Sequence, residues 1–319
     1  MESLPSVSVF MPVREAALTL ERAVASVLRQ DYPCIEQIFL AIGPSSDATE
    51  DIAQKCKSID NRIEIIQNDL GLTAIGLNKA ATAATGDYLV RVDSHCEIPQ
   101  GYVKDAIQTI TRTGAGNVGG IQRAVGESLF QRAVAHAMSS RFGVGNSKFH
   151  FGGKEGPTDT VYLGVYEAKL FHELGGFDES LVRNQDYELN NRIRRAGRIV
   201  WFDPKLEVKY FPRSNFQGLS SQYFQYGKWK RKVIAKDPRS AKFRQIIPPL
   251  TVLGILASAL LSVFKNSLFL LFPSIYGLSV ICACFSIPDL AFKERLRLFL
   301  VFPTMHISWG VGFLFGFGK

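Results

Sequence analysis

Cysteine is scarce in this chain, whose 319 residues include only Cys34, Cys56, Cys96, Cys282 and Cys284. The number is odd and no spacing matches a metal site, which argues against a disulfide framework or a zinc-binding fold. Cys282 and Cys284 lie inside an apolar run, where a free thiol behaves as a small hydrophobic group. We therefore expect a reducing compartment. The N-terminus also lacks the basic flank and long apolar core of a secretory signal.

Acidic residues are fewer than basic ones: 29 Asp and Glu stand against 37 Lys and Arg, a formal net charge of +8. Nucleic acid, anionic lipid or a phosphorylated substrate could each account for this excess. One basic stretch lies at 228–244, where Asp237 is the only acidic residue, and a shorter one contains Lys293, Arg295 and Arg297. The position of these charges, and not their total, has to decide between the three partners.

Charge is nearly absent from three runs, 246–264, 267–287 and 298–317, each about 20 residues long, which is the length of a membrane-spanning helix. The alternative is three buried core helices. Only Lys265 and Asn266 separate the first two runs, so these would form a tight helical hairpin. If all three runs cross, both basic stretches lie on one side, which is then the cytoplasm.

Near an anionic leaflet each Lys or Arg contributes about 1 kcal/mol. Basic residues beside the apolar runs therefore favour a membrane surface and weaken the nucleic-acid interpretation; a merely solvated charged surface is the other alternative.

The first two thirds of the chain alternate strand and helix patterns. Strands are predicted at 7–13, 37–43, 62–68 and 86–93, and helices at 20–30, 47–57 and 73–84. This alternation predicts βαβ units and a mainly parallel sheet, hence an α/β fold. Ligands of such sheets bind at the carboxyl ends of the strands. The polar residues that follow the strands are therefore the first candidates for a functional site.

A polar cluster follows the fourth predicted strand, where Asp93, His95 and Glu97 project into a loop. A divalent cation that bridges two phosphates neutralises a nucleoside diphosphate, and Mg²⁺ or Mn²⁺ prefers oxygen ligands, with imidazole also accepted by Mn²⁺. Asp93 supplies such an oxygen and His95 a second ligand. Taken alone, the cluster is better explained by a turn cap at Asp93 and an ordinary surface histidine at His95.

Five motifs in order change this weighing: SVFMPVREAALTLERAVASVLRQDYP, SSDATED, GLNKAATAATGDYLVRVDSH, GGFDESLVRNQDYELNNRIRRAG and FQYGKWK. Over about residues 6–232 the chain resembles the inverting family 2 glycosyltransferases with the GT-A fold. Within that family it is most similar to membrane-associated bacterial exopolysaccharide enzymes of the succinoglycan type. The resemblance implies sugar transfer from a nucleotide-sugar donor.

The resemblance also implies roles for single residues on the donor side. Pro12, Arg14 and Glu15 match the first nucleotide loop, with Arg14 at the diphosphate and Glu15 at the uridine or ribose. The other matched donor positions are Asp47 in the second loop, Asn78 and Lys79 on a helix, and Asp93 as the first metal-motif aspartate. His95 replaces the second metal-motif aspartate, and Ile42-Gly43 replaces an Asp-Asp pair that contacts the base or ribose.

Asp186 matches the family's catalytic base, which takes the proton of the acceptor hydroxyl in an inverting transfer. Gln185 stands where the family usually has Glu, which lowers the local negative charge. The alternative is that Asp186 or Glu188 caps the following helix, since acidic residues favour such positions.

Gln225, Lys228 and Trp229 form a Gln-x-x-Lys-Trp version of the family's Gln-x-x-Arg-Trp element. The resemblance places them at the acceptor or the diphosphate. A Trp beside basic residues before a span is also a common membrane anchor, so both roles stay open for Trp229.

The sequence thus predicts a glycosyltransferase domain at 1–232, a basic linker at 233–245 and three transmembrane helices at 246–319. The predicted enzyme transfers a sugar, expected to come from a UDP-sugar, with Mg²⁺ or Mn²⁺, to a polyprenyl-diphosphate-linked acceptor on the cytoplasmic face of the inner membrane. A non-catalytic nucleotide-sugar-binding membrane scaffold is the second hypothesis, and a nucleic-acid-binding protein is the third and least favoured.

Overall fold

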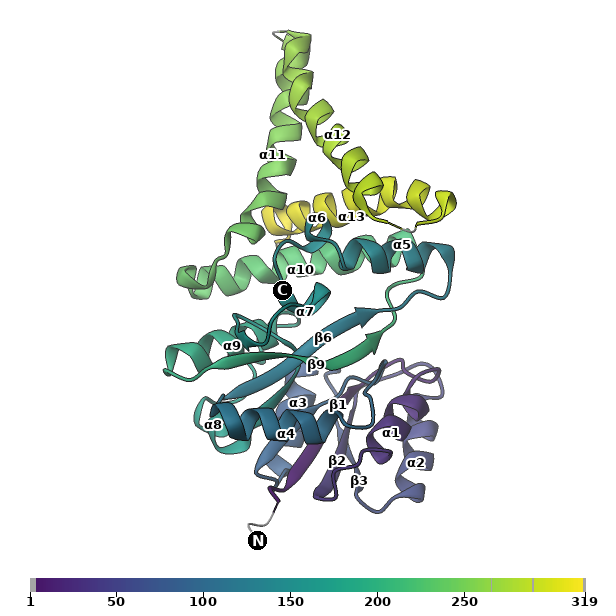
Figure 1. Ribbon diagram of the computed structural model, residues 1–319, viewed down its shortest axis with the longest axis vertical. Helices are drawn as coiled ribbons and strands as arrows, with labels where there is room; N and C mark the ends of the chain where they lie inside the picture. Colours follow the sequence, from purple (N-terminus) through teal and green to yellow (C-terminus); the bar gives the residue numbers. More distant parts are fainter. Residues whose placement is uncertain (1–3, 265, 289, 318–319) are drawn as a thin grey trace. The chain divides into compact units, whose positions relative to one another are not determined.

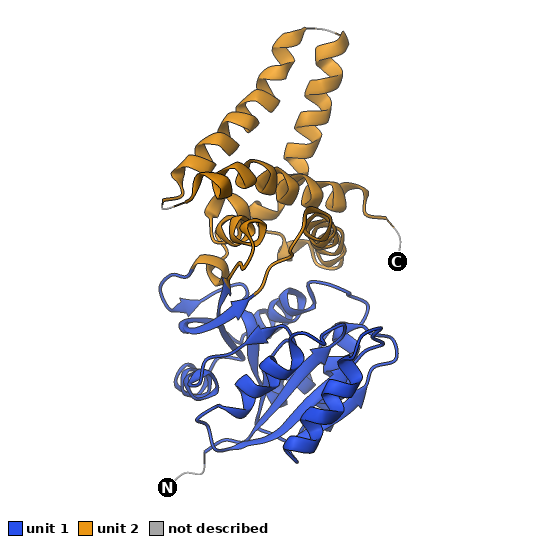
Figure 2. Ribbon diagram, turned by 90° about the vertical axis from the view of Figure 1, so that its right-hand side faces the viewer, with its two compact units in different colours: residues 1–123, 152–210 blue, residues 124–151, 211–319 orange. Residues whose placement is uncertain are grey.

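The computed structural model describes residues 4–264, 266–288 and 290–317. Lys265 of the predicted hairpin turn lies outside them, as do the two ends of the predicted domain ranges. The chain forms two compact units (Figure 2): the first comprises 1–123 and 152–210, and the second 124–151 and 211–319. The boundary predicted at 232 falls within a helix that groups with the second unit. Each unit is described by itself.

A mixed sheet forms the centre of the first unit, and the described residues place its strands in the order β3-β2-β1-β4-β8-β6-β9-β5, with β7 beside β9 (Figure 1). β1 pairs in parallel with β2 and β4, and β2 pairs in parallel with β3. β8 runs antiparallel to β4 and to β6. The strands are β1 (Val7–Val13), β2 (Ile35–Ile42), β3 (Ile63–Gln67), β4 (Tyr88–Arg91), β5 (Cys96–Glu97), β6 (Asn117–Ala124), β7 (Gly156–Pro157), β8 (Tyr162–Glu167) and β9 (Val200–Tyr210).

Helices join the parallel strands as the alternating pattern predicted. The helices of this unit are α1 (Leu20–Leu28), α2 (Thr49–Ile59), α3 (Thr73–Ala83), α4 (Tyr102–Thr113), α8 (Ala168–Glu173) and α9 (Gln185–Arg195). α1 and α4 bury one apolar side each against the sheet, because their apolar residues recur at helical spacing. The predicted α/β fold and the first four strands are therefore confirmed.

An aromatic cluster in the core lies under the carboxyl edge of β1 and β4. Phe10, Tyr166, Phe171 and Phe177 are all buried, and their rings meet mostly edge to face at 5.2–6.4 Å. In the β1–β4 ladder Phe10 is the partner of Arg91, whose guanidinium lies 6.0 Å from the Phe177 ring. The hydrophobic core therefore supports a buried cation at the edge of the sheet.

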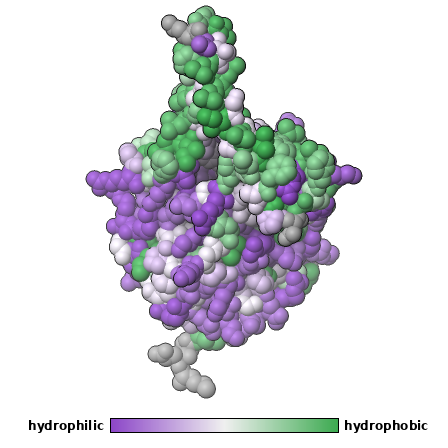
Figure 3. All heavy atoms as spheres, turned by 45° about the horizontal axis from the view of Figure 1, so that its top comes forward, coloured by the Kyte–Doolittle hydropathy of each residue, from purple (hydrophilic) through white to green (hydrophobic). Residues whose placement is uncertain are grey.

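The second unit is helical. Its helices are α5 (Leu129–Met138), α6 (Arg141–Val144), α7 (Lys148–Phe151), α10 (Phe216–Lys236), η1 (Pro238–Ser240), α11 (Phe243–Phe264), η2 (Ser267–Leu270), α12 (Leu271–Ser286) and α13 (Phe292–Phe315). Among the described residues, three helical segments, Phe243–Phe264, Ser267–Ser286 and Phe292–Phe315, are long and apolar enough to cross a membrane. α11 and α12 form a projecting hairpin (Figure 1) whose surface is almost continuously hydrophobic (Figure 3).

Candidate active site

The loops after β1, β2, β3 and β4 meet at one edge of the sheet, because these strands run parallel to one another. Pro12 is the second-last residue of β1, where it is the partner of Ala41 on β2, and it is half-buried. Arg14 and Glu15 follow at once in the exposed loop. The predicted donor-side residues thus stand at the position that α/β sheets use for nucleotides.

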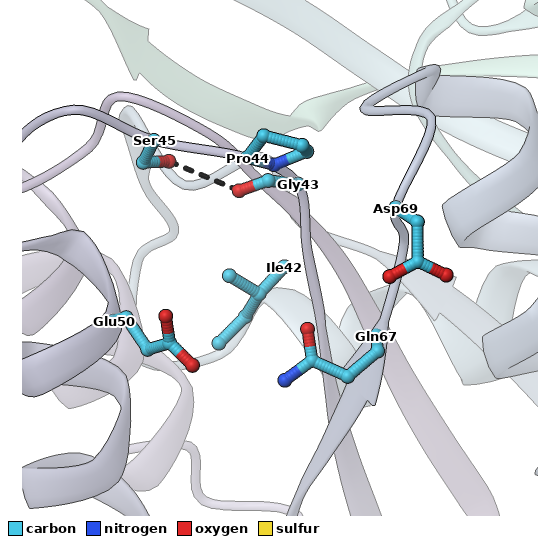
Figure 4. Close-up of a pocket in the computed structure, with 7 residues that line it drawn as sticks. All are labelled: Ile42, Gly43, Pro44, Ser45, Glu50, Gln67 and Asp69. Atoms are coloured by element: carbon cyan, nitrogen blue, oxygen red, sulfur yellow. Dashed lines mark hydrogen bonds between the residues drawn. The ribbon is translucent and has the colours of Figure 1, made fainter.

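A pocket opens between the ends of β2 and β3 (Figure 4). Its lining residues are Ile42, Gly43, Pro44, Ser45, Glu50, Gln67 and Asp69. Glu50 and Gln67 face each other across Ile42, and Asp69 stands beside Gln67 on the β3 side. The pocket volume is about 180 Å³, below the roughly 300–1,000 Å³ of sites that enclose a whole small molecule. It is sized for one part of a nucleotide sugar.

Arg14 lies against the backbone that closes this pocket. A Cβ on Gly43 would come 2.9 Å from the Gly71 Cα, so the two loops touch backbone to backbone. A Cβ on Gly71, whose φ is +61°, would meet the Arg14 guanidinium at 3.2 Å. The two glycines therefore make room for the Arg14 side chain next to the pocket.

Glu15 and Asp47 tie the first and second loops together. The Glu15 carboxylate accepts from the Ser46 amide at 2.8 Å, and the Glu15 amide donates to the Ser45 hydroxyl at 3.0 Å. Asp47 accepts from the amides of Ala17 and Thr49 and from the Thr49 hydroxyl. The Thr49 hydroxyl is the main cause that lowers the pKa of Asp47. Both acidic side chains shape the loops, and their contact with a donor stays a prediction.

Glu15 has a left-handed backbone, with φ 48°. This conformation is strained for any residue other than glycine, and such strain concentrates at ligand sites. The two hydrogen bonds between Glu15 and the second loop hold the strained backbone in place.

Asn78 and Lys79 on α3 have different roles. The Asn78 amide pairs with both the N–H and the C=O of Phe177, at 2.9 and 2.8 Å, and so clamps the loop after Gly176. Lys79 Nζ donates to the Gln67 carbonyl at 2.8 Å and lies 4.0 Å from an Asp69 carboxylate oxygen. Lys79 therefore places a cation beside the pocket, whereas Asn78 positions a loop.

Asp93 is buried at the end of β4, in a bidentate pair with Arg91. Arg91 Nε lies 2.8 Å from Oδ1 of Asp93, and Nη2 lies 3.3 Å from Oδ2. Residues two apart on a strand point to the same face, so this pairing follows from the local geometry. Each carboxylate oxygen keeps a further lone pair for another partner.

The charge of Asp93 is preserved despite burial. Burial alone would raise the pKa of Asp93, but Arg91, His95 and Arg183 together lower it below its usual value. Arg183 comes from the loop before α9, far away in sequence. The site thus gathers three basic side chains around one buried carboxylate.

Asp93, His95 and Cys96 form the one group of possible metal ligands found in the described part of the chain, with ligand atoms within 4.8 Å of one another. The Cys96 Sγ lies 2.8 Å from the Tyr162 hydroxyl, and burial raises the pKa of this thiol, so Cys96 stays protonated. A protonated thiol is a poor metal ligand. The carboxylate and imidazole that remain suit Mn²⁺, and the carboxylate suits Mg²⁺, which fits the predicted ion.

Asp186 stands in the first turn of α9, half-buried, and its Oδ1 accepts from the adjacent Tyr187 amide at 2.9 Å. The residue before the helix, Asn184, forms no side-chain cap. Both Asp93 and Asp186 raise the pKa of Arg91 against the effect of burial. Arg91 therefore lies within electrostatic reach of both the predicted metal ligand and the predicted base.

Glu188, one of the two acidic residues expected as a possible cap of this helix, bonds to another side chain of the same helix. It forms a two-armed pair with Arg192, with both N–O distances 2.7 Å. Arg192 also donates to the Gly176 carbonyl at 2.7 Å. This network holds the Gly175-Gly176 turn and engages Glu188, whereas Asp186 is not part of it.

Gln185 carries an anomaly beside this base. It is buried, and its Oε1 atom has no hydrogen-bond partner. An unpaired buried oxygen costs about 1–3 kcal/mol, and such atoms call for a functional or solvent partner.

Gln225, Lys228 and Trp229 belong to α10 of the second unit. The Trp229 indole is buried and donates to Gln225 Oε1 at 3.0 Å, while Lys232 Nζ lies 4.0 Å from its ring centroid. Gln225 and Trp229 are thus bound to each other within one helix. Their role toward an acceptor stays a prediction.

Sequence reasoning missed Arg91, Arg183, Gln67 and Asp69. Gln67 lies at the end of the third predicted strand and Asp69 directly follows it, so the strand-end rule that singled out Asp93 also applied to them. Arg91 precedes Asp93 by two residues on the strand predicted at 86–93, so the two side chains were expected on the same face. No local signal pointed to Arg183.

Comparison with known proteins shows the family to which the chain belongs. A family model described as Glycosyl transferase family 2 matches residues 8–175. The chain is 30% identical over 257 residues to the Succinoglycan biosynthesis protein ExoA of Rhizobium meliloti (strain 1021), covering 80% of this chain and 78% of that protein. It is 25% identical over 239 residues to the Dolichyl N-acetyl-alpha-D-glucosaminyl phosphate 3-beta-D-2,3-diacetamido-2,3-dideoxy-beta-D-glucuronosyltransferase of Methanococcus voltae, covering 72% and 74%.

Among solved structures, the mannosyltransferase PcManGT from Pyrobaculum calidifontis, in complex with GDP-Man and Mn²⁺, superposes with a TM-score of 0.62. The match covers 99% of this chain and 88% of that one at 16% identity, and it confirms the predicted GT-A fold. Because the family model covers more than half of the chain and the Rhizobium relative aligns over four fifths of it, the protein belongs to glycosyl transferase family 2.

Proposed function

We propose that this glycosyltransferase moves a sugar from a nucleoside-diphosphate sugar to a lipid-linked saccharide acceptor, with inversion at the anomeric carbon. The observation that carries the proposal is that Arg91, at the carboxyl edge of the sheet, pairs with Asp93 and is also within electrostatic reach of Asp186. One carboxylate is suited to a cation under the leaving group and the other to the acceptor. The acceptor class is supported by the names of two relatives, one of which refers to succinoglycan biosynthesis and the other to a dolichyl phosphate sugar.

A divalent metal is proposed as the cofactor, held by Asp93 and His95. Bound there, Mg²⁺ or Mn²⁺ would neutralise the charge that develops on the departing diphosphate. Arg91 keeps Asp93 ionised and oriented for this task, since it binds both oxygens. Arg183 and Arg14 bring further positive charge to the same edge of the sheet for the diphosphate.

Asp186 is proposed as the general base. Its carboxylate takes the proton of the acceptor hydroxyl while that oxygen forms a bond to the anomeric carbon. On the opposite side the bond from the anomeric carbon to the diphosphate oxygen breaks, and the diphosphate keeps the electron pair. Such a base contributes roughly 10²–10⁴-fold to the rate. The unpaired Gln185 oxygen would orient the incoming hydroxyl.

The donor base is proposed to be uracil, in the pocket between β2 and β3. The small volume of that pocket favours a pyrimidine over a purine. Asp69 can accept from the ring N–H, and the Gln67 amide can pair with a ring carbonyl. These two residues would then contact the base in place of the family's Asp-Asp pair, which this chain lacks because Ile42 and Gly43 occupy those positions.

The enzyme is further proposed to work on the cytoplasmic face of the inner membrane, since the basic residues of the second unit lie beside its apolar helices. Membrane attachment suits a polyprenyl-linked acceptor, which stays in the bilayer. The limits 1–232, 233–245 and 246–319, and acceptor contacts by Gln225, Lys228 and Trp229, stay predictions.

A transfer assay tests the proposal. Membranes with the full chain, Mn²⁺ and a set of UDP- and GDP-sugars are mixed with polyprenyl-diphosphate-linked saccharides, and products are identified by mass. We expect transfer by the wild type and by Asp51→Asn, which removes an exposed carboxylate on α2. Asp93→Asn and Asp186→Asn should each lose at least about 100-fold.

Two results would overturn the proposal. If Asp186→Asn transfers sugar as fast as Asp51→Asn, Asp186 is not the base. If the wild type binds nucleotide sugars with metal but turns over none with any acceptor, the non-catalytic scaffold is the better description.

A further inference from the structure

α13 has two different long faces within the second unit. One face is buried and contains Glu294, Leu298, Val301, Phe302, Met305 and Gly312. The other is exposed and almost wholly apolar, with Phe292, Leu296, Leu300, Ile307 and Phe315 between 38% and 72% exposed. The exposed residues recur mostly at four-residue or seven-residue intervals, so they form one stripe along the helix. Such a stripe needs an apolar environment on that side alone.

The buried face of α13 lies directly on α10. A Cβ on Gly227 would come 1.9 Å from the Trp309 carbonyl, and a Cβ on Gly312 would come 2.1 Å from the Phe224 carbonyl. The hydroxyls of Ser220 and Ser308 lie 2.9 Å apart. The C-terminal part of α13 is therefore in backbone contact with α10, and the two helices must share one depth relative to a bilayer there.

α10 cannot lie in hydrocarbon. Its last nine residues include Lys228, Lys230, Arg231, Lys232 and Lys236. Charged side chains within a bilayer are costly and rare. Arg231 reaches the end of α13, where it donates to the carbonyls of Phe313 and Leu314 at 3.4 and 3.2 Å. The partner that covers the C-terminal half of α13 is thus strongly basic, which matches an anionic lipid surface and not a membrane interior.

The start of α13 is also held by polar contacts. Glu294 is buried and pairs with Arg132 of α5. Arg295 donates to the carbonyls of Cys284 and Ile287 at the end of α12. Figures 1 and 2 show α13 running across the α11–α12 hairpin, beside α10. α11 and α12 differ from α13, since their exposed residues are apolar on nearly all sides.

We propose that only α11 and α12 cross the membrane, and that α13 lies along the bilayer surface. Its stripe of exposed apolar residues enters the boundary between headgroups and acyl chains, and the basic residues of α10 face anionic headgroups. This differs from the three spans that length and composition predict. Two crossings return the chain to its starting side, so the C-terminus lies on the same side as the N-terminus.

Tag accessibility in the full-length protein tests this arrangement. One short epitope tag is placed before Met1, after Lys319, or between Lys265 and Asn266, and sealed vesicles of both orientations are treated with protease. We expect the two terminal tags to be cleaved in the same vesicle orientation and the hairpin tag in the opposite one. A C-terminal tag on the side opposite the N-terminal tag overturns the proposal, and so does a hairpin tag on the same side as both ends.

A matched pair of lysine variants adds a second measurement. Leu256 in the middle of α11 and Leu300 in the middle of α13 are 53% and 59% exposed. Leu256→Lys should reduce translocation of the hairpin tag, because the charge then lies within the bilayer. Leu300→Lys should leave the C-terminal tag where it is in the wild type, since a surface lysine can reach the headgroups. A change in the side of the C-terminal tag in Leu300→Lys would show that α13 crosses.

Discussion

The pair between Arg91 and Asp93 makes a quantitative prediction, because the chain holds a matched pair elsewhere. Arg62 and Asp60 are also two residues apart and two-armed, with N–O distances of 3.0 and 2.7 Å. The side chains of Arg91 and Asp93 are 10% and 11% exposed, whereas those of Arg62 and Asp60 are 34% and 20% exposed. The two pairs therefore differ mainly in burial.

Arg91→Met should cost far more stability than Arg62→Met. Removal of one partner from a buried pair costs about 3–5 kcal/mol. Fully exposed pairs contribute about 0.2–1 kcal/mol, and the half-buried pair of Arg62 and Asp60 should lie between the two ranges. At roughly 2–4 °C per kcal/mol for a unit of this size, Arg91→Met should lower the Tm by about 6–20 °C. Thermal unfolding of the detergent-solubilised full chain, followed by intrinsic fluorescence, measures the difference.

The cost should also depend on pH. In the wild type the folded pKa of Asp93 is below its unfolded value of about 3.9. Its stabilisation is therefore present above that value and is lost as the pH falls through the folded pKa. Without Arg91, burial should raise the folded pKa of Asp93 above its unfolded value. As the pH falls, Asp93 should therefore be protonated at a higher pH in folded Arg91→Met than in the folded wild type, which relieves the cost of the unpaired charge. The stability gap between wild type and Arg91→Met should be widest at neutral pH and narrow toward pH 4.

Equal Tm values for Arg91→Met and Arg62→Met would refute the reasoning. So would a gap that stays constant between pH 7 and pH 4. Arg91→Lys should fall between wild type and Arg91→Met, since Lys keeps the charge but lacks the two-armed geometry.

Three further predictions concern single contacts. His95→Ala should increase the Mn²⁺ concentration needed for half-maximal transfer by at least about tenfold. Cys96→Ser should leave that concentration unchanged, because the Cys96 thiol stays protonated. Titration of the transfer activity with Mn²⁺ compares the two variants. Asp69→Ala should raise the KM for a UDP-sugar by roughly tenfold or more with kcat little changed, since only base binding is lost. Asn78→Ala should lower the Tm by a few degrees, because two hydrogen bonds to Phe177 are lost at about 1 kcal/mol each.

Each of these has a contrary outcome. Loss of metal response in Cys96→Ser would make the thiol a ligand. An unchanged KM for Asp69→Ala would show that the uracil ring of the donor binds outside this pocket. Unaltered stability in Asn78→Ala would remove its role as a clamp.

The chain's secondary structure was readable because it depends on local pattern. The strand of residues 7–13 was predicted with its observed limits, and the helix from Thr73 ends within one residue of its predicted end. Asp93 and Asp186 could be proposed as site residues for a related reason, since a strand end marks the first and an ordered set of motifs marks both. Arg91 and Asp69 were open to the same local rules and were overlooked.

The partners of side chains were decided by tertiary structure alone. Asn78 bonds to Phe177, which lies 99 positions away in the sequence. A local sequence pattern cannot predict a partner at that separation. Arg183 acts on Asp93 for the same reason. Length and apolar character identified α13 as able to span a bilayer, but they describe the helix in isolation. Its depth depends on α10, because two helices in backbone contact must share one environment.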